Sequence, residues 1–268
     1  MGKIFKLKNK VLNISAIYVY NCGCERLSML EGKGLTKFFG ALAAVKDVSF
    51  KIDEKEIVGL IGPNGSGKTT LFNLISGFYK PDSGKVLFMG RDITGFPQHK
   101  ICKMGIARTY QIVRPFLEMS VLENVMVGAL YGAGEGLSKS RAEALEYLKF
   151  VGLDGKKDVY ARNLNICERK ILEIARALAA EPKILLLDEP LSGLNPKEIV
   201  QAKEIIKKIR DDFGITVFWV EHIMRALRGV VERVIVLNYG EKIAEGPFEE
   251  VTSSQKVIEA YLGEKWII

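Results

Sequence analysis

The segment GPNGSGKTT, residues 62–70, constrains the fold of this chain more than any other stretch. It matches the phosphate-binding pattern G-x-x-x-x-G-K-[ST], whose glycines let the backbone turn tightly enough to point N–H groups at phosphate oxygens. The apolar run EIVGLI (56–61) precedes the segment, and the amphipathic run TTLFNLISGF (69–78) follows it. This order predicts a buried strand, a loop and a helix whose N-terminus faces bound phosphates.

Two side chains of this segment are expected to act directly on a nucleotide. Lys68 is predicted to reach the β- and γ-phosphates, and the Thr69 hydroxyl is predicted to bind Mg²⁺. The segment therefore indicates a nucleoside triphosphate and Mg²⁺ as ligands. The residues predicted to surround the nucleotide are Gly62, Pro63, Asn64, Gly65, Ser66, Gly67, Lys68, Thr69 and Thr70.

A second chemical signal is the run ILLLDEP (184–190), an apolar strand that ends in two carboxylates. In a parallel sheet the end of this strand would lie beside the phosphate loop, since ligand sites form at the carboxyl ends of such strands. Asp188 is expected to hold Mg²⁺ through water there. Glu189 is expected to polarise the attacking water as the general base.

The alternation of strands and helices predicts an α/β core that is interrupted by a helical insert. Apolar residues spaced three and four apart predict helices over 120–133, 138–153, 168–180 and 195–212. The turn residues at 81–84 introduce a predicted strand pair. The predicted strands are VKDVSFKI (45–52), EIVGLI (56–61), the pair GKVLFMGRDI (84–93), KILLLDEP (183–190), GITVFWVEH (214–222) and VERVIVLNYGEKIAEG (231–246).

Charge and cysteine content exclude several classes of protein. The net charge is +7. Residues 1–28 contribute +4 of it, because they contain five basic side chains and one acidic side chain. The rest is only mildly basic, which disfavours a nucleic-acid partner and suits work beside an anionic membrane. The four cysteines match neither a zinc nor a disulfide framework, which indicates a reducing cytosol. Residues 1–28 are predicted to be a poorly ordered extension.

The order of the motifs GPNGSGKTT, RTYQ, IARAL, LLLDEP, SGLNP and EH resembles that of ATP-binding-cassette (ABC) transporter ATPases, over residues 30–268. The resemblance implies an α/β fold of the P-loop NTPase class, with a RecA-like core, an antiparallel β subdomain and an inserted α-helical subdomain. The nucleotide is then expected to be ATP. The implied division is an extension (1–28), a first part of the nucleotide-binding core (29–116), a helical subdomain (117–181) and a second core part with the C-terminal segment (182–268).

Three further site residues come only from this resemblance. Gln111, in RTYQ, is similar to the loop glutamine that contacts Mg²⁺ and the attacking water. His222, after the strand ITVFWVE, is similar to the histidine that contacts the γ-phosphate. Phe39 resembles the aromatic residue that stacks on adenine, with Phe38 as the alternative, and the other of the two is expected to be part of the core.

A narrower resemblance is carried by the stretch 105–129, by SGLNP and by VIEAYLGE (257–264). These resemble the larger cassette subunit of the branched-chain amino acid importers. The resemblance implies a peripheral protein at the cytoplasmic face of the cell membrane, with two permease subunits and either a second cassette subunit or a second copy of itself as partners. IVRPF (112–116) would contact the permease, or alternatively form an internally packed hinge loop.

The family's signature L-S-G-G-Q falls on LNICE, which begins at Leu164. Its glycine lets a helix N-terminus approach the γ-phosphate bound by the opposite subunit, so a cysteine there is expected to weaken that contact. The acidic residue adds negative charge, which Arg169 and Lys170 could offset. Asn165 and Glu168 fit a capping box, so the helix itself is expected to form. The predicted signature residues are Asn165, Ile166, Cys167 and Glu168.

This altered signature predicts an asymmetric pair of ATP sites. ATP on this chain is expected to be hydrolysed with Glu189 and His222, whereas ATP on the partner is expected to turn over slowly. Three alternatives remain open at this point. They are the ATPase of lipopolysaccharide export, a nucleotide-binding subunit with little ATPase activity, and a non-transport cassette protein of translation or DNA repair.

Overall fold

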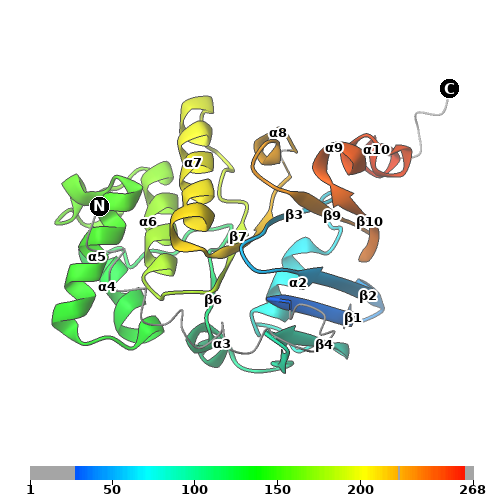
Figure 1. The fold of residues 1–268 in the computed structure, drawn as a ribbon, viewed down its shortest axis with the longest axis horizontal. Helices are drawn as coiled ribbons and strands as arrows, with labels where there is room; N and C mark the ends of the chain where they lie inside the picture. The colour runs from blue at the N-terminus through cyan, green and yellow to red at the C-terminus, as the bar shows by residue number, and fades with distance from the viewer. Residues whose placement is uncertain (1–27, 223, 263–268) are drawn as a thin grey trace, which may run out of the picture.

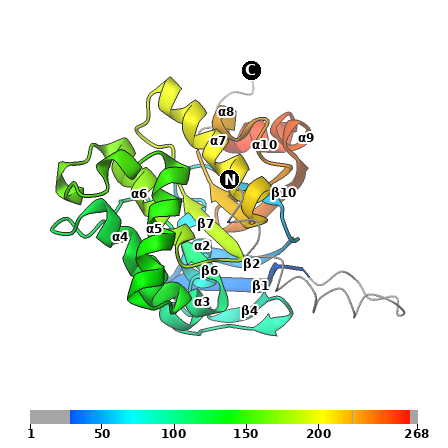
Figure 2. The ribbon, with the colours of Figure 1, turned by 60° about the vertical axis from the view of Figure 1, so that its left-hand side comes forward.

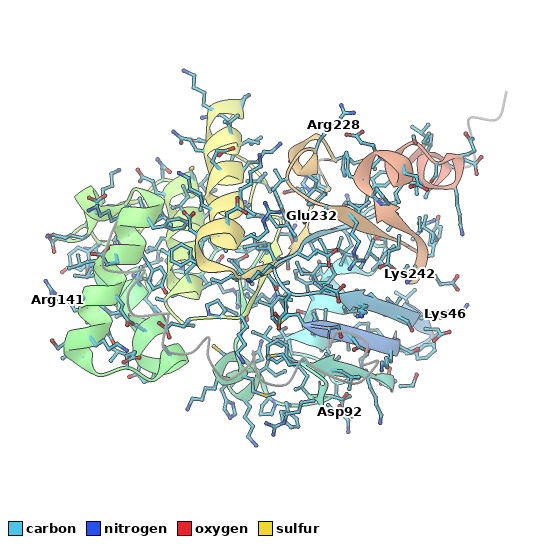
Figure 3. All side chains as sticks on the ribbon, viewed as in Figure 1. Lys46, Asp92, Arg141, Arg228, Glu232 and Lys242 are labelled. Carbon is cyan, nitrogen blue, oxygen red and sulfur yellow. The ribbon has the colours of Figure 1, made fainter. Side chains whose placement is uncertain are left out.

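The structure is a computed structural model that describes residues 28–222 and 224–262. The predicted extension therefore lies outside the described residues, apart from Ser28. Cys22, Cys24 and the last two residues of VIEAYLGE also lie outside them. Charged side chains such as Lys46, Arg141 and Arg228 point outward from the fold (Figure 3).

The central element is a six-stranded sheet with the order β10-β9-β3-β8-β7-β6. Every neighbouring pair is parallel except β9 and β10, which are antiparallel. The middle strands are buried along their whole length, because helices or the second sheet cover both faces (Figure 1). The strands are β3 (Ile57–Ile61), β6 (Ile106–Arg108), β7 (Ile184–Asp188), β8 (Thr216–Val220), β9 (Arg233–Asn238) and β10 (Glu241–Pro247).

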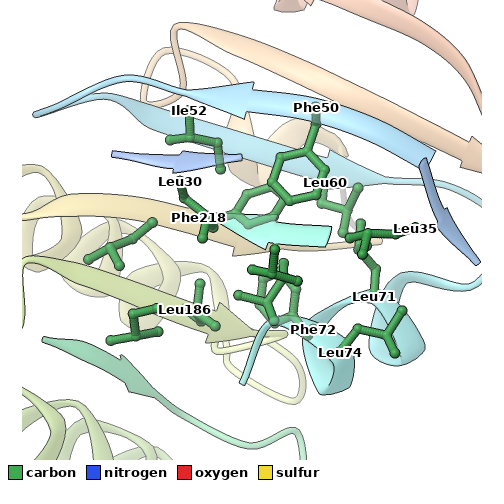
Figure 4. Close-up of a cluster of buried hydrophobic side chains, with 14 of the residues drawn as sticks. Leu30, Leu35, Phe50, Ile52, Leu60, Leu71, Phe72, Leu74, Leu186 and Phe218 are labelled. Atoms are coloured by element: carbon green, nitrogen blue, oxygen red, sulfur yellow. The ribbon is translucent and has the colours of Figure 1, made fainter. Parts of the chain in front are cut away.

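A second, antiparallel sheet has the order β2-β1-β4-β5. Its last two strands are the pair predicted over 84–93, although β4 already begins inside the predicted turn. The helix α2 (Lys68–Ile75) and the inner faces of the two sheets share one apolar core, in which Phe218 lies 5.0 Å from Phe72 between ring centroids (Figure 4). The strands are β1 (Leu30–Phe39), β2 (Leu42–Ile52), β4 (Ser83–Phe88) and β5 (Arg91–Asp92).

Helices cover the other face of the six-stranded sheet. The long helix α7 begins at Asn195, whose side chain caps it in a capping box, and Pro196 occupies its first turn. Its apolar residues Ala202, Ile206 and Ile209 are buried in a second core. The helices on this side are α7 (Pro196–Phe213), α8 (Met224–Leu227), α9 (Phe248–Thr252) and α10 (Gln255–Leu262).

A group of helices forms a third core at the opposite end of the molecule from α9 and α10 (Figures 1 and 2). The helix predicted over 120–133 continues from α4 into a π-helix, η1. A Cβ on Gly128 would lie 2.1 Å from the Arg176 carbonyl oxygen, so glycine is required where η1 meets α6. The elements are α4 (Val121–Val127), η1 (Gly128–Ala133), α5 (Leu137–Val151) and α6 (Ile166–Leu178), with α3 (Gln98–Met104) nearby.

The observed architecture confirms the predicted fold class: a mostly parallel α/β core, an antiparallel sheet packed on it and a helical insert between β6 and β7. The residues at which one subdomain gives way to the next remain a prediction. Among the helices that the structure describes, none combines the length and apolarity needed to cross a bilayer.

Candidate functional site

The phosphate loop connects the end of β3 to the first residue of α2, as the sequence predicts. Gly67 adopts a φ of 103°, and a Cβ at this position would lie 2.3 Å from the Ala44 carbonyl oxygen of β2. Only glycine fits this approach, because an L-residue would meet both an unfavourable φ and a backbone clash. Asn64 and Gly65 are exposed at the loop tip, and Thr69 is exposed in the first turn of α2.

Lys68 folds over this loop and is almost fully buried. Its Nζ donates to the carbonyl oxygens of Gly62, at 2.7 Å, and Pro63, at 2.8 Å. Burial lowers the pKa of Lys68, while Glu189 and Asp188 act in the opposite direction. The phosphate loop, Lys68 and the two carboxylates therefore form one electrostatic cluster at the edge of the sheet.

Asp188 lies at the end of β7 and forms a buried ion pair with Arg108, with Oδ2 2.8 Å from Nη2. Burial raises the pKa of Asp188, and the hydrogen bond and charge of Arg108 lower it. The second carboxylate oxygen, Oδ1, is buried and has no hydrogen-bond partner within the described residues. A spare carboxylate oxygen fits Mg²⁺ or one of its waters, because this cation prefers oxygen ligands.

The three residues predicted to be catalytic meet at one carboxylate oxygen. Gln111 Nε2 donates to Glu189 Oε2 at 2.9 Å, and His222 Nδ1 lies 3.4 Å from the same oxygen. The elements β6, β7 and β8 position them, since each residue follows closely on the carboxyl end of one of these strands. This geometry places a potential general base, an amide donor and an imidazole within reach of one water molecule.

Phe38 and Phe39 lie side by side at the exposed end of β1, and both are more than 40% exposed. The expectation that one of them is part of the core is therefore wrong. A register shift after Lys37 carries the strand end beyond the core. Phe39 makes an edge contact with Tyr79, with ring centroids 5.2 Å apart. Lys37 Nζ lies over the same ring, 5.9 Å from its centroid, and the ring is 43% exposed, so part of it is accessible to an adenine base.

The altered signature forms the first turn of α6. Asn165 Oδ1 accepts from the Glu168 backbone N–H at 2.9 Å, and Glu168 accepts from the Asn165 N–H, so the predicted capping box is present. Ile166 is 61% exposed, whereas Cys167 is buried. The pKa of the Cys167 thiol is raised to about 11, first by burial and next by the charge of Glu198.

Two expectations about the signature charge need correction. Glu168 is paired with Lys156, a residue of the preceding turn, and not with its neighbours. Arg169 donates instead to the Arg162 carbonyl oxygen, and Lys170 donates to the loop after β7. The carboxylate is thus neutralised from outside α6, because side chains one and two positions away point to other faces of the helix.

Two ionic residues further along α6 were not predicted from the sequence: Glu173, which is buried, and Arg176, which is half-buried. Glu173 accepts from the Tyr110 N–H at 3.2 Å, and Arg176 donates to the Arg114 carbonyl oxygen at 3.1 Å. The Arg176 guanidinium also stacks on Phe116, 5.4 Å from its centroid. The sequence signal for them was the spacing of Lys170, Glu173 and Arg176, which lie three residues apart on a helix whose neighbouring positions are apolar.

These contacts border a groove of about 540 Å³ between α3, η1 and α6. Aromatic residues Tyr110, Phe116 and Tyr131 line it, together with Arg176. Ile112 is 74% exposed and Phe116 is 46% exposed, so part of IVRPF faces solvent.

Comparison with known protein families agrees with this geometry. The family model described as ABC transporter matches residues 45–192. A second family model, described as branched-chain amino acid ATP-binding cassette transporter, matches residues 241–266.

Curated relatives match along nearly their full length. The high-affinity branched-chain amino acid transport ATP-binding protein BraF of Pseudomonas aeruginosa is 41% identical over 250 residues, which cover 88% of this chain and 98% of BraF. LivG of Escherichia coli (strain K12), which has the same description, is 40% identical with the same coverage. The lipopolysaccharide export system ATP-binding protein LptB of Haemophilus influenzae is 35% identical over 240 residues, covering 90% of this chain and 99% of LptB.

Solved structures show the same fold. The ADP conformation of an ATP-binding cassette from an ABC transporter has a TM-score of 0.80 and 33% identity, covering 88% of this chain and 99% of that one. A dimeric cassette bound to ADP and phosphate has a TM-score of 0.74 and 30% identity, covering 82% of this chain and 99% of that one. The fold and the site thus define a P-loop ATPase. The chain belongs to the ABC transporter family, as an ATP-binding subunit that hydrolyses ATP to power transport.

Proposed function

We propose that this chain powers the uptake of branched-chain amino acids through partner permeases. The support is twofold: the C-terminal match at residues 241–266, and the names of the relatives BraF and LivG. The substrate would contact the permeases and not this subunit, so no residue of the site is assigned to it.

The proposed residue roles are supported by one observation, which carries the proposal: Gln111 and His222 both contact Oε2 of Glu189. Glu189 acts as general base toward the attacking water, Gln111 orients that water, and His222 contacts the γ-phosphate. Lys68 and the N–H groups of the phosphate loop bind the β- and γ-phosphates, and Phe39 stacks on adenine.

Mg²⁺ is proposed to bind between the Thr69 hydroxyl, Gln111 and, through water, the free Oδ1 of Asp188. When bound, the cation neutralises charge on the phosphate oxygens. The buried ion pair with Arg108 keeps the Asp188 carboxylate in one orientation, so that one oxygen remains available.

The partners are proposed to be two permeases and a second cassette, at the cytoplasmic face of the membrane. The groove beside α6, with Phe116 and Arg176 in its lining, has the aromatic and arginine composition of a protein-docking site. Ile112, in the same loop as Phe116, is exposed. A related cassette is dimeric in its solved structure. Because the signature of this chain is altered, the proposed second cassette is a different subunit, and the two ATP sites are unequal.

The test is Glu189→Gln in this subunit alone. ATP turnover is expected to fall by about 100-fold or more, because a general base typically contributes that much. ATP binding, measured with a fluorescent analogue, is expected to persist. Glu146→Gln on the exposed side of α5 is the matched control. Unchanged turnover in Glu189→Gln would exclude both the assigned base and the unequal sites.

The second candidate is the ATPase of lipopolysaccharide export, favoured only by the 35% identity to LptB. Copurification of the chain from membranes distinguishes the two, because the permeases that accompany it identify the system. Loss of labelled leucine uptake in a strain that lacks this chain supports the importer. Intact uptake contradicts it.

A further inference from the structure

Lys170 occupies an unusual position for a lysine: it is almost completely buried, on the face of α6 that packs against the loop after β7. Its Nζ donates to the Glu189 carbonyl oxygen at 3.1 Å and to the Ser192 carbonyl oxygen at 2.6 Å. Burial lowers the pKa of Lys170, while Glu221, Glu189 and Glu173 raise it. A buried lysine costs stability unless its charge and hydrogen bonds are satisfied, so a simple packing role would favour an apolar residue here.

The loop that Lys170 contacts has a strained backbone. Glu189 has a φ of 48°, in the left-handed region that non-glycine residues rarely adopt. Such a conformation costs on the order of 1 kcal/mol or more and persists only where neighbouring groups fix it. Three hydrogen bonds fix it here: the Glu189 N–H donates to the Val220 carbonyl oxygen at 3.0 Å, and the Glu189 carbonyl oxygen accepts from Lys170 at 3.1 Å and from the Ser192 N–H at 3.2 Å.

The side-chain direction of Glu189 depends on this backbone conformation. A different φ would rotate Cβ about the N–Cα bond relative to β7 and so change the direction of the carboxylate, which meets Gln111 and His222 in the structure. Both hydrogen bonds of Lys170 go to main-chain oxygens, so Lys170 acts on the position of the Glu189 backbone, and its charge also interacts with the Glu189 carboxylate.

We propose that Lys170 is a positioning residue that keeps Glu189 in its left-handed conformation and ties the catalytic loop to the signature helix. This inference rests on the proposed role of Glu189 as general base. The helix α6 begins with the altered signature, which is proposed to face the partner's nucleotide, and its residues Glu173 and Arg176 contact the loop at 110–116. One helix therefore contacts both the catalytic loop of this chain and the loop that contains Gln111.

The experiment compares Lys170→Met with Lys170→Arg in the full chain, by steady-state ATPase kinetics. Lys170→Met is expected to lower kcat by about tenfold or more while KM for ATP stays within about threefold, because the phosphate loop is untouched. Lys170→Arg can still donate to both carbonyl oxygens and is expected to retain about half of the kcat. Lys203→Met is the matched control. Lys203 lies on α7 and also donates to a carbonyl oxygen, that of Arg228, at 3.0 Å.

The double variant Lys170→Met with Glu189→Gln separates this inference from the proposed function. If Lys170 acts through Glu189, its loss adds little to Glu189→Gln alone. A fall in Glu189→Gln with no fall in Lys170→Met overturns the positioning role only, whereas no fall in Glu189→Gln overturns the proposed base. Should Lys170→Met fail to fold, Lys170→Leu replaces it, because leucine also lacks a hydrogen-bond donor. Equal kcat values for Lys170→Leu and Lys170→Arg would then refute the inference.

Discussion

At the residue scale, Asp188 and Glu189 are neighbours in sequence but have opposite surroundings. Asp188 still belongs to β7, so its carboxylate is buried beside Arg108. Glu189 follows the last strand residue, turns into the left-handed region and directs its carboxylate to a more open place beside His222. A fixed carboxylate with one free oxygen suits a cation, and a more accessible carboxylate suits a water molecule. The proposed roles differ for this reason.

The phosphate loop offers a prediction at the same scale. Gly67→Ala is expected to abolish ATP binding and lower the free energy of unfolding by about 1–3 kcal/mol, because its Cβ meets the Ala44 carbonyl at a left-handed φ. Gly155→Ala is the control, since a Cβ there meets nothing within 4 Å. Nucleotide titration and denaturant unfolding provide the two readouts. Wild-type ATP affinity in Gly67→Ala would contradict the close approach of the loop to β2.

At the element scale, α6 contains the altered signature in its first turn and also contacts the loop after β7 through Lys170. Its first turn is stabilised by the capping box and by Lys156, so the loss of the family glycine leaves helix formation intact. Cys167 is buried and Ile166 is exposed. The exposed isoleucine side chain and the missing glycine are therefore both obstacles to a phosphate at this helix N-terminus.

Removal of the cap tests this description. Asn165→Ala is expected to lower the free energy of unfolding by about 1 kcal/mol, the usual value of a helix N-cap. Asn195→Ala, which removes the equivalent cap of α7, should cost a similar amount. Urea unfolding of the two variants gives the comparison. A stability loss at Asn195 without one at Asn165 would show that the first turn of α6 does not depend on its cap.

At the scale of the whole molecule, the site lies where three subdomains meet. The antiparallel sheet supports the phosphate loop and contains Phe39, which is proposed to stack on adenine. The parallel core contributes both carboxylates, and α6 joins the helical end to the loop after β7. The groove beside α6 shares Glu173 and Arg176 with this connection. A protein bound in the groove would therefore contact the same helix that contacts Glu189.

The loop at 110–116, whose Tyr110 and Phe116 line the groove, gives a prediction at this scale. Ile112→Glu is expected to prevent copurification with the permeases, because a buried charge at an interface lacks a partner. Its unfolding temperature should remain near that of the wild type, since the side chain is 74% exposed. Val200→Glu on α7, at an exposed apolar position away from the groove, is the control. Retained copurification of Ile112→Glu would place the docking surface elsewhere.

Much of this protein could be predicted from its sequence because the signals are local. A phosphate loop needs glycines between a strand and a helix, and an N-cap needs Asn165 three residues before Glu168. Both follow from backbone geometry within one turn. The prediction of Asp188 and Glu189 also required only that parallel strands end at one edge, whereas Gln111 and His222 were predicted from the family resemblance.

The tertiary structure alone decided which charges pair across elements. The pairs of Arg108 with Asp188 and of Lys156 with Glu168 each join separate elements, and so does the hydrogen bond from Lys170 to the Glu189 carbonyl. The same holds for Phe38 and Phe39, whose exposure depends on a register shift between strands. Local motifs are determined by bonds between near neighbours in the chain. Contacts between distant segments depend on packing, which no short stretch of sequence contains.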